Sequence, residues 1–415
     1  MKAPSRFVLS AALALLAPAH ASILAAQAPL RFVSVSAGSG HSCALTNEGV
    51  AYCWGGNPVG QLGSDSAQEH CATLGRPYRC SPTPLRVKGA QRFTSLGLGA
   101  PVTCGLLESG AAYCWGDRSF GPIGDTALAT WTTPVMVADT PTFVSLSAGC
   151  GVFCGVTGSG AAYCAGRRNN GVLGVGDPAA AFGEQRQPVP ISGSLTFSAI
   201  GIGGNGFACA LTRDGRAYCW GMDAGWGVLG RRGARSSSPL LIADAPRFQS
   251  LSVGGYHVCG LTPDGTAFCW GGGTHGQLGN GDEESSLRPV RVDAPLVFRS
   301  ISAGGSHTCA VTAEGVAYCW GSNDSGQLGN PNTHDNCGEG VCSRRPQAVA
   351  GDLRFTVISA GGSHTCGVAS GGAVYCWGSN EDGQLGVPRG RKQCGFGQEA
   401  EPCSLTPVRV SDPRQ

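Results

Sequence analysis

Apolar and polar residues alternate in short runs along most of the chain, and the runs recur with a period of roughly fifty residues. In the clearest copy, residues 298–303 (FRSISA) alternate in this way, which predicts a half-buried β-strand. A Gly pair ends the run, and residues 307–311 and 316–320 predict a second and a third strand joined by a tight turn. A Pro before an apolar triplet predicts a short fourth strand.

Seven copies share these landmarks, and together they predict an all-β, seven-bladed β-propeller. Each copy opens on an anchor Phe: Phe32, Phe93, Phe143, Phe197, Phe248, Phe298 and Phe355. Each turn between the second and third strands ends in a Gly, which suits a left-handed backbone: Gly49, Gly110, Gly160, Gly215, Gly265, Gly315 and Gly372. The Pro residues are Pro84, Pro134, Pro188, Pro239, Pro289, Pro346 and Pro407.

The copies occupy about residues 31–90, 91–140, 141–194, 195–245, 246–295, 296–352 and 353–411, so one propeller spans 31–411. Residues 407–410 are the last copy's Pro and the apolar strand that it leads, with no further copy after them. We expect this C-terminal strand to join the N-terminal blade and so to close the ring, because closure removes exposed strand edges.

Two Cys residues stand ten positions apart in every copy, and a three-residue turn places them opposite each other on neighbouring strands. We therefore predict one cross-strand disulfide per copy. The expected pairs are Cys43 with Cys53, Cys104 with Cys114, Cys154 with Cys164, Cys209 with Cys219, Cys259 with Cys269, Cys309 with Cys319, and Cys366 with Cys376. The alternative is reduced thiols that act as small buried core residues.

The first 21 residues have the three parts of a secretory signal peptide, and residues 22–30 form a short linker. Lys2 and Arg6 supply the positive region, residues 8–17 the apolar region, and residues 19–21 (AHA) the cleavage site. Disulfides persist outside the cytosol, so the Cys pairs agree with export. We expect a secreted or periplasmic, cell-envelope protein with no membrane span.

Charge argues against a nucleic-acid partner. Without Lys2 and Arg6, 27 of the 29 basic residues remain against 27 acidic ones, so the exported chain is close to neutral. Hydrophobic residues make up 42% of the chain, enough to build a core despite 67 Gly and 25 Pro. We expect a monomer.

The segment GGSHTCAVTAEGVAYCWGSNDSGQLG, residues 304–329, resembles the RCC1 (regulator of chromosome condensation) repeat family. The resemblance covers about residues 31–410 and implies a seven-bladed propeller. The family's founder is a nuclear guanine-nucleotide exchange factor for a small GTPase, and other members are binding scaffolds. With its export signal, this chain resembles exported bacterial-type members, one of which inhibits β-lactamases through a propeller face. Fold alone does not choose among these roles.

Copies one, six and seven, which are neighbours in a closed ring, each carry an insertion before the Pro with its own Cys couple. We predict three further disulfides: Cys71 with Cys80, Cys337 with Cys342, and Cys394 with Cys403. Arg and aromatic residues in and beside these loops suggest a protein-binding face: Arg76, Tyr78, Arg79, Arg344, Arg345, Arg389, Arg391, Lys392 and Phe396. The alternative is that the bridged insertions are merely tolerated surface loops.

Other residues suggest chemistry only weakly. His41, His257, His307 and His364 occupy equivalent positions, but equivalent positions are spread around a ring and would not converge on one metal ion. The acidic turns at 323–326, 380–383 and 282–284 lack the spaced ligands of a calcium loop. The recurring Trp fits inter-blade packing, whereas Trp131 and Trp226 lie off the repeat and are better candidates for surface positions.

Cys150 has no obvious partner, and we expect either a buried thiol or intermolecular pairing. No catalytic or phosphate-binding motif is present, so neither enzyme activity nor a cofactor or metal is predicted. The favoured function is an exported, non-enzymatic protein-binding scaffold of the adhesion or inhibitory type. The alternatives are a guanine-nucleotide exchange factor and a carbohydrate-binding propeller.

Overall fold

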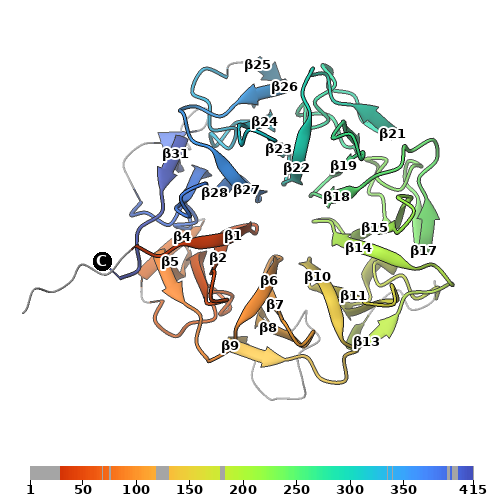
Figure 1. The fold of residues 1–415 in the computed structure, drawn as a ribbon, viewed down its shortest axis with the longest axis horizontal. Helices are drawn as coiled ribbons and strands as arrows, with labels where there is room; N and C mark the ends of the chain where they lie inside the picture. Colours follow the sequence, from red (N-terminus) through yellow and green to blue (C-terminus); the bar gives the residue numbers. More distant parts are fainter. Residues whose placement is uncertain are drawn as a thin grey trace, which may run out of the picture.

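A computed structural model describes residues 29–67, 69–73, 76–117, 130–177, 183–333, 335–338, 340–389, 393–394 and 401–414. The expected signal peptide and most of the linker lie outside the described residues. The described chain forms seven antiparallel sheets arranged as a ring, which confirms the seven-bladed propeller (Figure 1). Among these residues no helix is long and apolar enough to cross a membrane.

Each blade has four strands in the order of the sequence, with the first strand nearest the axis of the ring (Figure 1). The inner strands are β1 Phe32–Ala37, β6 Phe93–Leu98, β10 Phe143–Gly149, β14 Phe197–Ile202, β18 Ser250–Val253, β22 Phe298–Ala303 and β27 Phe355–Ala360. The second strands are β2 His41–Thr46, β7 Val102–Leu107, β11 Val152–Thr157, β15 Phe207–Thr212, β19 His257–Leu261, β23 His307–Thr312 and β28 His364–Ala369.

The third strands are β3 Ala51–Gly56, β8 Ala112–Asp117, β12 Ala162–Arg167, β16 Ala217–Met222, β20 Ala267–Gly271, β24 Ala317–Ser322 and β29 Val374–Ser379. The outer strands are β5 Arg76–Arg86, β9 Thr130–Met136, β13 Glu184–Pro190, β17 Arg235–Leu241, β21 Ser286–Arg291, β26 Gly340–Ala348 and β31 Glu401–Arg409. Short added strands extend three blades: β4 Glu69–Thr73, β25 Asp335–Cys337 and β30 Gln393–Cys394. A 3-10 turn, η2, covers Asn169–Gly171.

The turn chemistry read from the sequence appears in the backbone. All seven final Gly residues of the turns have positive φ, from 73° at Gly49 to 93° at Gly160, where a residue with a Cβ would be strained. The outer strands begin several residues before their Pro, earlier than expected. Each Pro falls in the stretch of its outer strand where the register with the third strand shifts, so its missing N–H breaks no ladder bond there.

The expected mode of ring closure is wrong. The C-terminal strand β31 pairs with β29 of its own copy and not with the N-terminal blade, since each copy already supplies four strands. Blades seven and one are instead joined by the same backbone hydrogen bond that joins each of the other neighbouring blades. The anchor Phe amide donates to the carbonyl of the preceding blade's turn Gly, at 2.8 Å for Phe32 to Gly372 and 2.8 Å for Phe93 to Gly49.

The core lies between blades and centres on six fully buried Trp side chains. Each indole N–H crosses to a backbone carbonyl in the preceding blade's Gly-rich turn, as in Trp320 to Gln277 (3.0 Å) and Trp377 to Gln327 (2.9 Å). The Gly that ends that turn lies against the indole, as Gly329 does against Trp377, so no larger residue fits there. The Trp residues therefore have the packing role expected from their recurrence.

Blade three replaces the Trp by Ala165, and the lost volume returns on the facing strand. Phe153 stands directly opposite Ala165, fully buried, and its ring lies 5.6 Å from that of Phe143. In other blades the residue opposite the Trp is small, such as Ser42 opposite Trp54. The large and the small residue have exchanged strands, so a large ring still fills the joint with blade two.

This exchange predicts strong coupling between the two positions. Phe153→Thr should cost roughly 3–4 kcal/mol by leaving a cavity, and Ala165→Trp roughly 1–3 kcal/mol by overpacking. The double variant restores the arrangement of the other blades and should be closer to wild type than the sum of the single changes. Denaturant titrations of the four proteins measure the coupling, and simple additivity would contradict the explanation.

Candidate functional site

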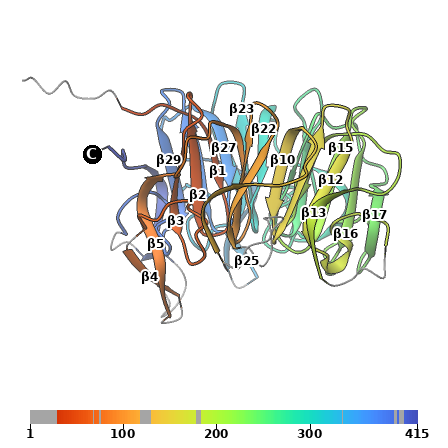
Figure 2. The same cartoon turned by 90° about the horizontal axis from the view of Figure 1, so that it is seen from below.

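One face of the ring carries both the turns between first and second strands and the loops between third and fourth strands. We call it the loop face. Figure 2 shows β4 and β25 projecting from this edge. The three insertions all lie here, in the adjacent blades six, seven and one, because they interrupt the same connection in each copy.

The seven cross-strand Cys pairs within the blades are disulfides, as predicted. In each pair the two residues face each other in register, with Cα atoms 4.0 to 4.1 Å apart. The bonds are Cys43–Cys53, Cys104–Cys114, Cys154–Cys164, Cys209–Cys219, Cys259–Cys269, Cys309–Cys319 and Cys366–Cys376. The alternative of reduced core thiols therefore does not apply to these positions of the structure.

The three Cys couples of the insertions are also disulfides. They are Cys71–Cys80, Cys337–Cys342 and Cys394–Cys403, with Cα separations of 5.7 to 5.8 Å. Each of these bridges ties a short added strand to the outer strand of its blade.

The hairpin of blade one is braced against blade seven. The Tyr78 hydroxyl donates a hydrogen bond to Oδ1 of Asp382, and the Cys71 sulfur lies 3.6 Å from the Asp382 carbonyl oxygen. The Arg389 guanidinium donates to the carbonyl of His70 at 3.1 Å. Residues more than three hundred positions apart thus form one continuous surface.

Beside this contact a cleft of about 400 Å³ opens on the loop face between blades one and two, with Asp382 at its blade-seven side. This volume is within the range of small-ligand sites. The lining is mostly small and apolar or uncharged: Ser39, Gly40, His41, Gly56, Pro58, Gln61, Pro77, Tyr78, Ala100, Pro101 and Asp382.

Asp382 is the carboxylate of the cleft. Burial raises its pKa to about 6, the nearby charge of Glu401 adds to the rise, and the charge of Arg389 opposes it. Its Oδ2 lies against Gly40, where a Cβ would clash with it. The cleft thus presents a half-buried acidic group in a mostly apolar wall, an arrangement that favours a basic or hydrogen-bond-donating ligand.

Comparison with known proteins places the chain in a family. A family model described as RCC1-like domain matches residues 125–414, and the regulator of chromosome condensation (RCC1) repeat matches residues 32–61. This protein belongs to the RCC1-like domain family. The expected resemblance to RCC1 repeats is confirmed.

Solved structures share the fold of this RCC1-like protein. Human WBSCR16 superposes with a TM-score of 0.73 at 19% identity, covering 88% of this chain and 95% of that one. Prp20p from Saccharomyces cerevisiae gives 0.73 at 21% identity, covering 93% and 88%. Prp20p itself binds Gsp1p and histones.

Curated relatives match only in part. The ultraviolet-B receptor UVR8 of Arabidopsis thaliana is 33% identical over 97 residues, which is 23% of this chain and 20% of the receptor. Alsin of Pan troglodytes is 47% identical over 91 residues, 20% of this chain and 5% of that protein. The chain spans a fifth or less of the length of these relatives, so the match conveys the repeat and not a whole protein's activity.

The Arg and aromatic residues predicted from the loops have different surroundings. Tyr78 lines the cleft. Arg344 is paired with Glu283 (2.8 Å from Nε), and Arg345 with Asp293 (2.6 Å), so both already bind blade five. Arg79 is exposed.

The other predicted residues add less to this surface. Arg389, in blade seven, donates to the His70 carbonyl of blade one and is already engaged in this contact. The Arg76 side chain, Arg391, Lys392 and Phe396 lie outside the described residues.

Sequence reasoning missed the cleft itself. Asp382 appeared only as part of an acidic turn, and Gly40, Pro58, Pro77 and Pro101 were not singled out. Comparison of the copies offers one signal. In the other three copies that share the GQLG turn, the position of Asp382 is occupied by Val59, His275 and Ser325.

The remaining candidates look structural. Trp226 is half-buried against Tyr256, with ring centroids 5.3 Å apart, and Trp131 is also half-buried. Both are more exposed than the six fully buried Trp residues of the repeat, as expected. Cys150 is free, and its thiol contacts the carbonyl of Gly204, while burial raises its pKa.

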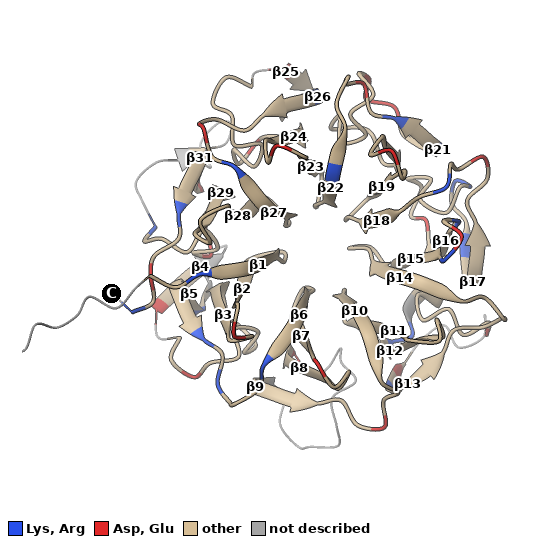
Figure 3. Cartoon of the chain, viewed as in Figure 1, with Lys and Arg blue, Asp and Glu red and all other residues tan. Residues whose placement is uncertain are grey.

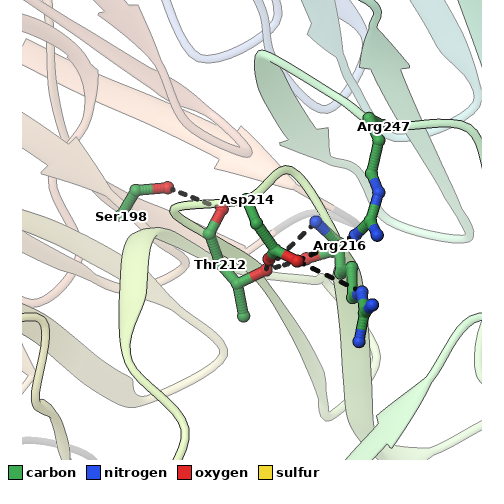
Figure 4. Close-up of polar contacts among 5 residues, drawn as sticks. All are labelled: Ser198, Thr212, Asp214, Arg216 and Arg247. Carbon is green, nitrogen blue, oxygen red and sulfur yellow. Dashed lines mark hydrogen bonds and ion pairs between the residues drawn. The ribbon is translucent and has the colours of Figure 1, made fainter.

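Charge is spread along the outside of the ring, and the inner strands are mostly uncharged apart from a basic segment on β22, which contains Arg299 (Figure 3). Figure 4 shows the turn of blade four at the far end of the second and third strands. There the Thr212 hydroxyl donates a hydrogen bond to the Asp214 carboxylate. The guanidinium groups of Arg247 and Arg216 lie 3.0 and 3.2 Å from Oδ2 of Asp214. These contacts lower the pKa of Asp214, the Thr212 bond most. The cluster is solvent-exposed, and it shapes a turn.

The four equivalent His side chains lie in four separate blade joints. The Nε2 of His307 is 2.9 Å from the Thr365 hydroxyl of the next blade, which itself donates to the Gln327 carbonyl at 2.8 Å. The hydroxyl is therefore the acceptor, and His307 is neutral with its proton on Nε2. His364 closes the ring in the same way through Ser42, at 2.8 Å.

Burial lowers the pKa of His257, His307 and His364 to about 3 and that of His41 to about 4. The unfolded chain takes up these protons near pH 6.5, whereas the folded chain does not, so stability should fall as the pH falls from about 6.5 toward 3.

His257→Gln keeps a side-chain N–H donor but removes this titration. At pH 7 the variant should lose about 1 kcal/mol. Between about pH 6.5 and 4 its unfolding free energy should fall by roughly 2–3 kcal/mol less than that of wild type. Denaturant titrations of both proteins at pH 7, 6.5 and 4 test this, with the exposed His70→Gln as control. Equal acid losses in wild type and His257→Gln would refute it.

Proposed function

We propose that this protein is an exported, non-enzymatic protein-binding scaffold whose partner docks on the loop face of blades six, seven and one. The observation that carries the proposal is the grouping of three disulfide-bridged hairpins in adjacent blades on one face. A surface whose loops are already fixed loses less conformational entropy on binding than one with free loops.

Contacts between the loops strengthen this support. Tyr78 and Arg389 join blades one and seven, and Arg344 joins blades six and five through Glu283. The hairpins therefore form a braced surface and are not independent appendages. The ten disulfides support export to an oxidising compartment, in agreement with the signal sequence expected at residues 1–21.

The test is a comparison of three baits in capture from the native envelope and medium. The first is the exported chain, and the second replaces the three bridged hairpins by the shorter connection of blade five, residues 272–285. The third, a control, changes the exposed Arg231 and Arg232 to Ser on the loop of blade four. A partner held by the first and third baits and lost by the second is the expected result.

Equal capture by all three baits would contradict a loop-face site in blades six, seven and one. Circular dichroism, together with a mapping of the seven blade disulfides, would show whether the trimmed protein keeps its fold. For an isolated partner, the expected loss of affinity is at least about a hundredfold, because the trimmed segments supply the centre of the proposed interface.

A second candidate is a guanine-nucleotide exchange factor-like regulator of a small GTPase. Family membership favours it, as does one matched relative named X-linked retinitis pigmentosa GTPase regulator homolog, from Caenorhabditis elegans, 29% identical over 92 residues. Release of labelled GDP from a panel of small GTPases separates the candidates. The scaffold proposal predicts no acceleration, and a GTPase whose GDP release is accelerated would favour the second candidate.

A further inference from the structure

The cleft contains a charged group that the local fold does not need. The turn that holds Asp382 is fixed by other atoms: the Gln384 side chain accepts from the Asp382 amide at 2.8 Å, and Asn380 accepts from Leu385 at 3.1 Å. In blade six the same two bonds form around Ser325, at 2.9 and 3.1 Å. The Asp382 carboxylate is therefore an addition to a turn that forms without it.

The neighbouring blade is shaped to receive this carboxylate. Four other copies have Pro101, Tyr256, Ser306 or Ser363 at the position of Gly40, and two have Gly (Gly151 and Gly206) with positive φ. Gly40 does not have positive φ, and its missing Cβ leaves room for Oδ2 of Asp382. Tyr78 fixes the other oxygen from the bridged hairpin. Two blades thus hold one acidic side chain at the wall of a cleft.

No Lys or Arg is among the described residues that line this cleft. In the described part of the chain, the charged groups that act on Asp382 are Glu401, which opposes its ionisation, and Arg389, which favours it and also binds the His70 carbonyl. His41 lines the cleft but is neutral, because burial lowers its pKa to about 4; its Nε2 contacts the Thr103 hydroxyl at 2.9 Å. Among the described residues, Arg389 is the one cation that acts on this acidic group, so its charge is only partly compensated there.

We propose that the cleft binds a cationic side chain, Lys or Arg, presented by the partner protein, with the ammonium or guanidinium against Asp382. The aliphatic stem would lie along Pro58, Pro77 and Pro101, and Tyr78 would add its ring beside the cation. This inference rests on the proposed protein-binding function and specifies the chemistry of the partner's central contact.

Charge complementarity selects this occupant over a neutral one. A partly buried carboxylate is poorly solvated, and a cation brought into the same low-dielectric space recovers the lost interaction. Such desolvated charge contacts are typical of the residues that dominate interface affinity. Binding should weaken as the pH falls through about 6, because protonated Asp382 has no charge to offer.

The experiment titrates the whole exported chain with N-acetyl-arginine amide and N-acetyl-lysine amide, and with N-acetyl-glutamine amide as an uncharged probe. Binding is followed by NMR of protein labelled with ¹³C at the Asp carboxyl carbons. The expected result is saturable binding of both cations, a lowered pKa of Asp382 in their presence, and no binding of the glutamine probe.

The variants isolate the charge. Asp382→Asn keeps an acceptor for Tyr78 and should weaken cation binding at least about tenfold, whereas the adjacent Glu381→Gln removes the same charge and should leave it unchanged. Gly40→Ser should also weaken binding by displacing the carboxylate without neutralising it. Equal effects of Asp382→Asn and Glu381→Gln would overturn the inference, since they would indicate that the probes respond to the general negative charge of this region and not to a contact with Asp382.

Two further outcomes also overturn it. The first is binding of the cation probes only after Arg391 and Lys392 are changed to Ser, which would mean that the chain supplies its own cation. The second is a captured partner held equally well by wild type and by Asp382→Asn. In that case loss of the partner on trimming the hairpins would still uphold the scaffold proposal, so the two failures are distinguishable.

Discussion

The hydrogen bond from each Trp indole to the preceding blade's turn is the contact on which the ring depends. It joins a buried side chain of one copy to a backbone carbonyl of the previous copy, and it closes the ring between Trp54 and Gln384 at 2.9 Å. Because the indole is both the largest buried side chain and a hydrogen-bond donor, one residue supplies packing and orientation at each of six joints. A repeat whose faces are covered only by its neighbours needs a packed joint at every step, and Phe153 fills the seventh, between blades two and three.

The acceptor at this joint is a backbone carbonyl, so the turn can change its side chains without losing the bond. Val172 and Val228 replace Gln in blades three and four, yet Trp220 and Trp270 still donate to their carbonyls, at 2.8 and 3.1 Å. Blades three and four lack the hydrogen bond from a His ring to a hydroxyl of the next blade, since Val152 and Phe207 take the His positions. Blades can therefore drift in sequence and accept insertions while the ring persists.

The repeat made much of this fold predictable. Spacing alone located the strands, the left-handed turn Gly residues and the opposed Cys pairs, because each depends on residues close together in one copy. Ring closure was wrongly predicted, since the phase of the repeat does not say whether a copy's last strand stays with its own blade. The cleft was out of reach for a related reason: Gly40 and Asp382 come together only once the ring closes.

The position of Asp382 also explains why such a group can persist in the scaffold. Its raised pKa means that the folded chain ionises it less readily than the unfolded chain, so above about pH 4 it opposes folding. A ring held by repeated Trp joints and cross-strand disulfides can retain one unfavourable carboxylate without unfolding. A poorly solvated carboxylate that Tyr78 holds in place and Gly40 accommodates is preorganised in the way that a binding site for a cation requires.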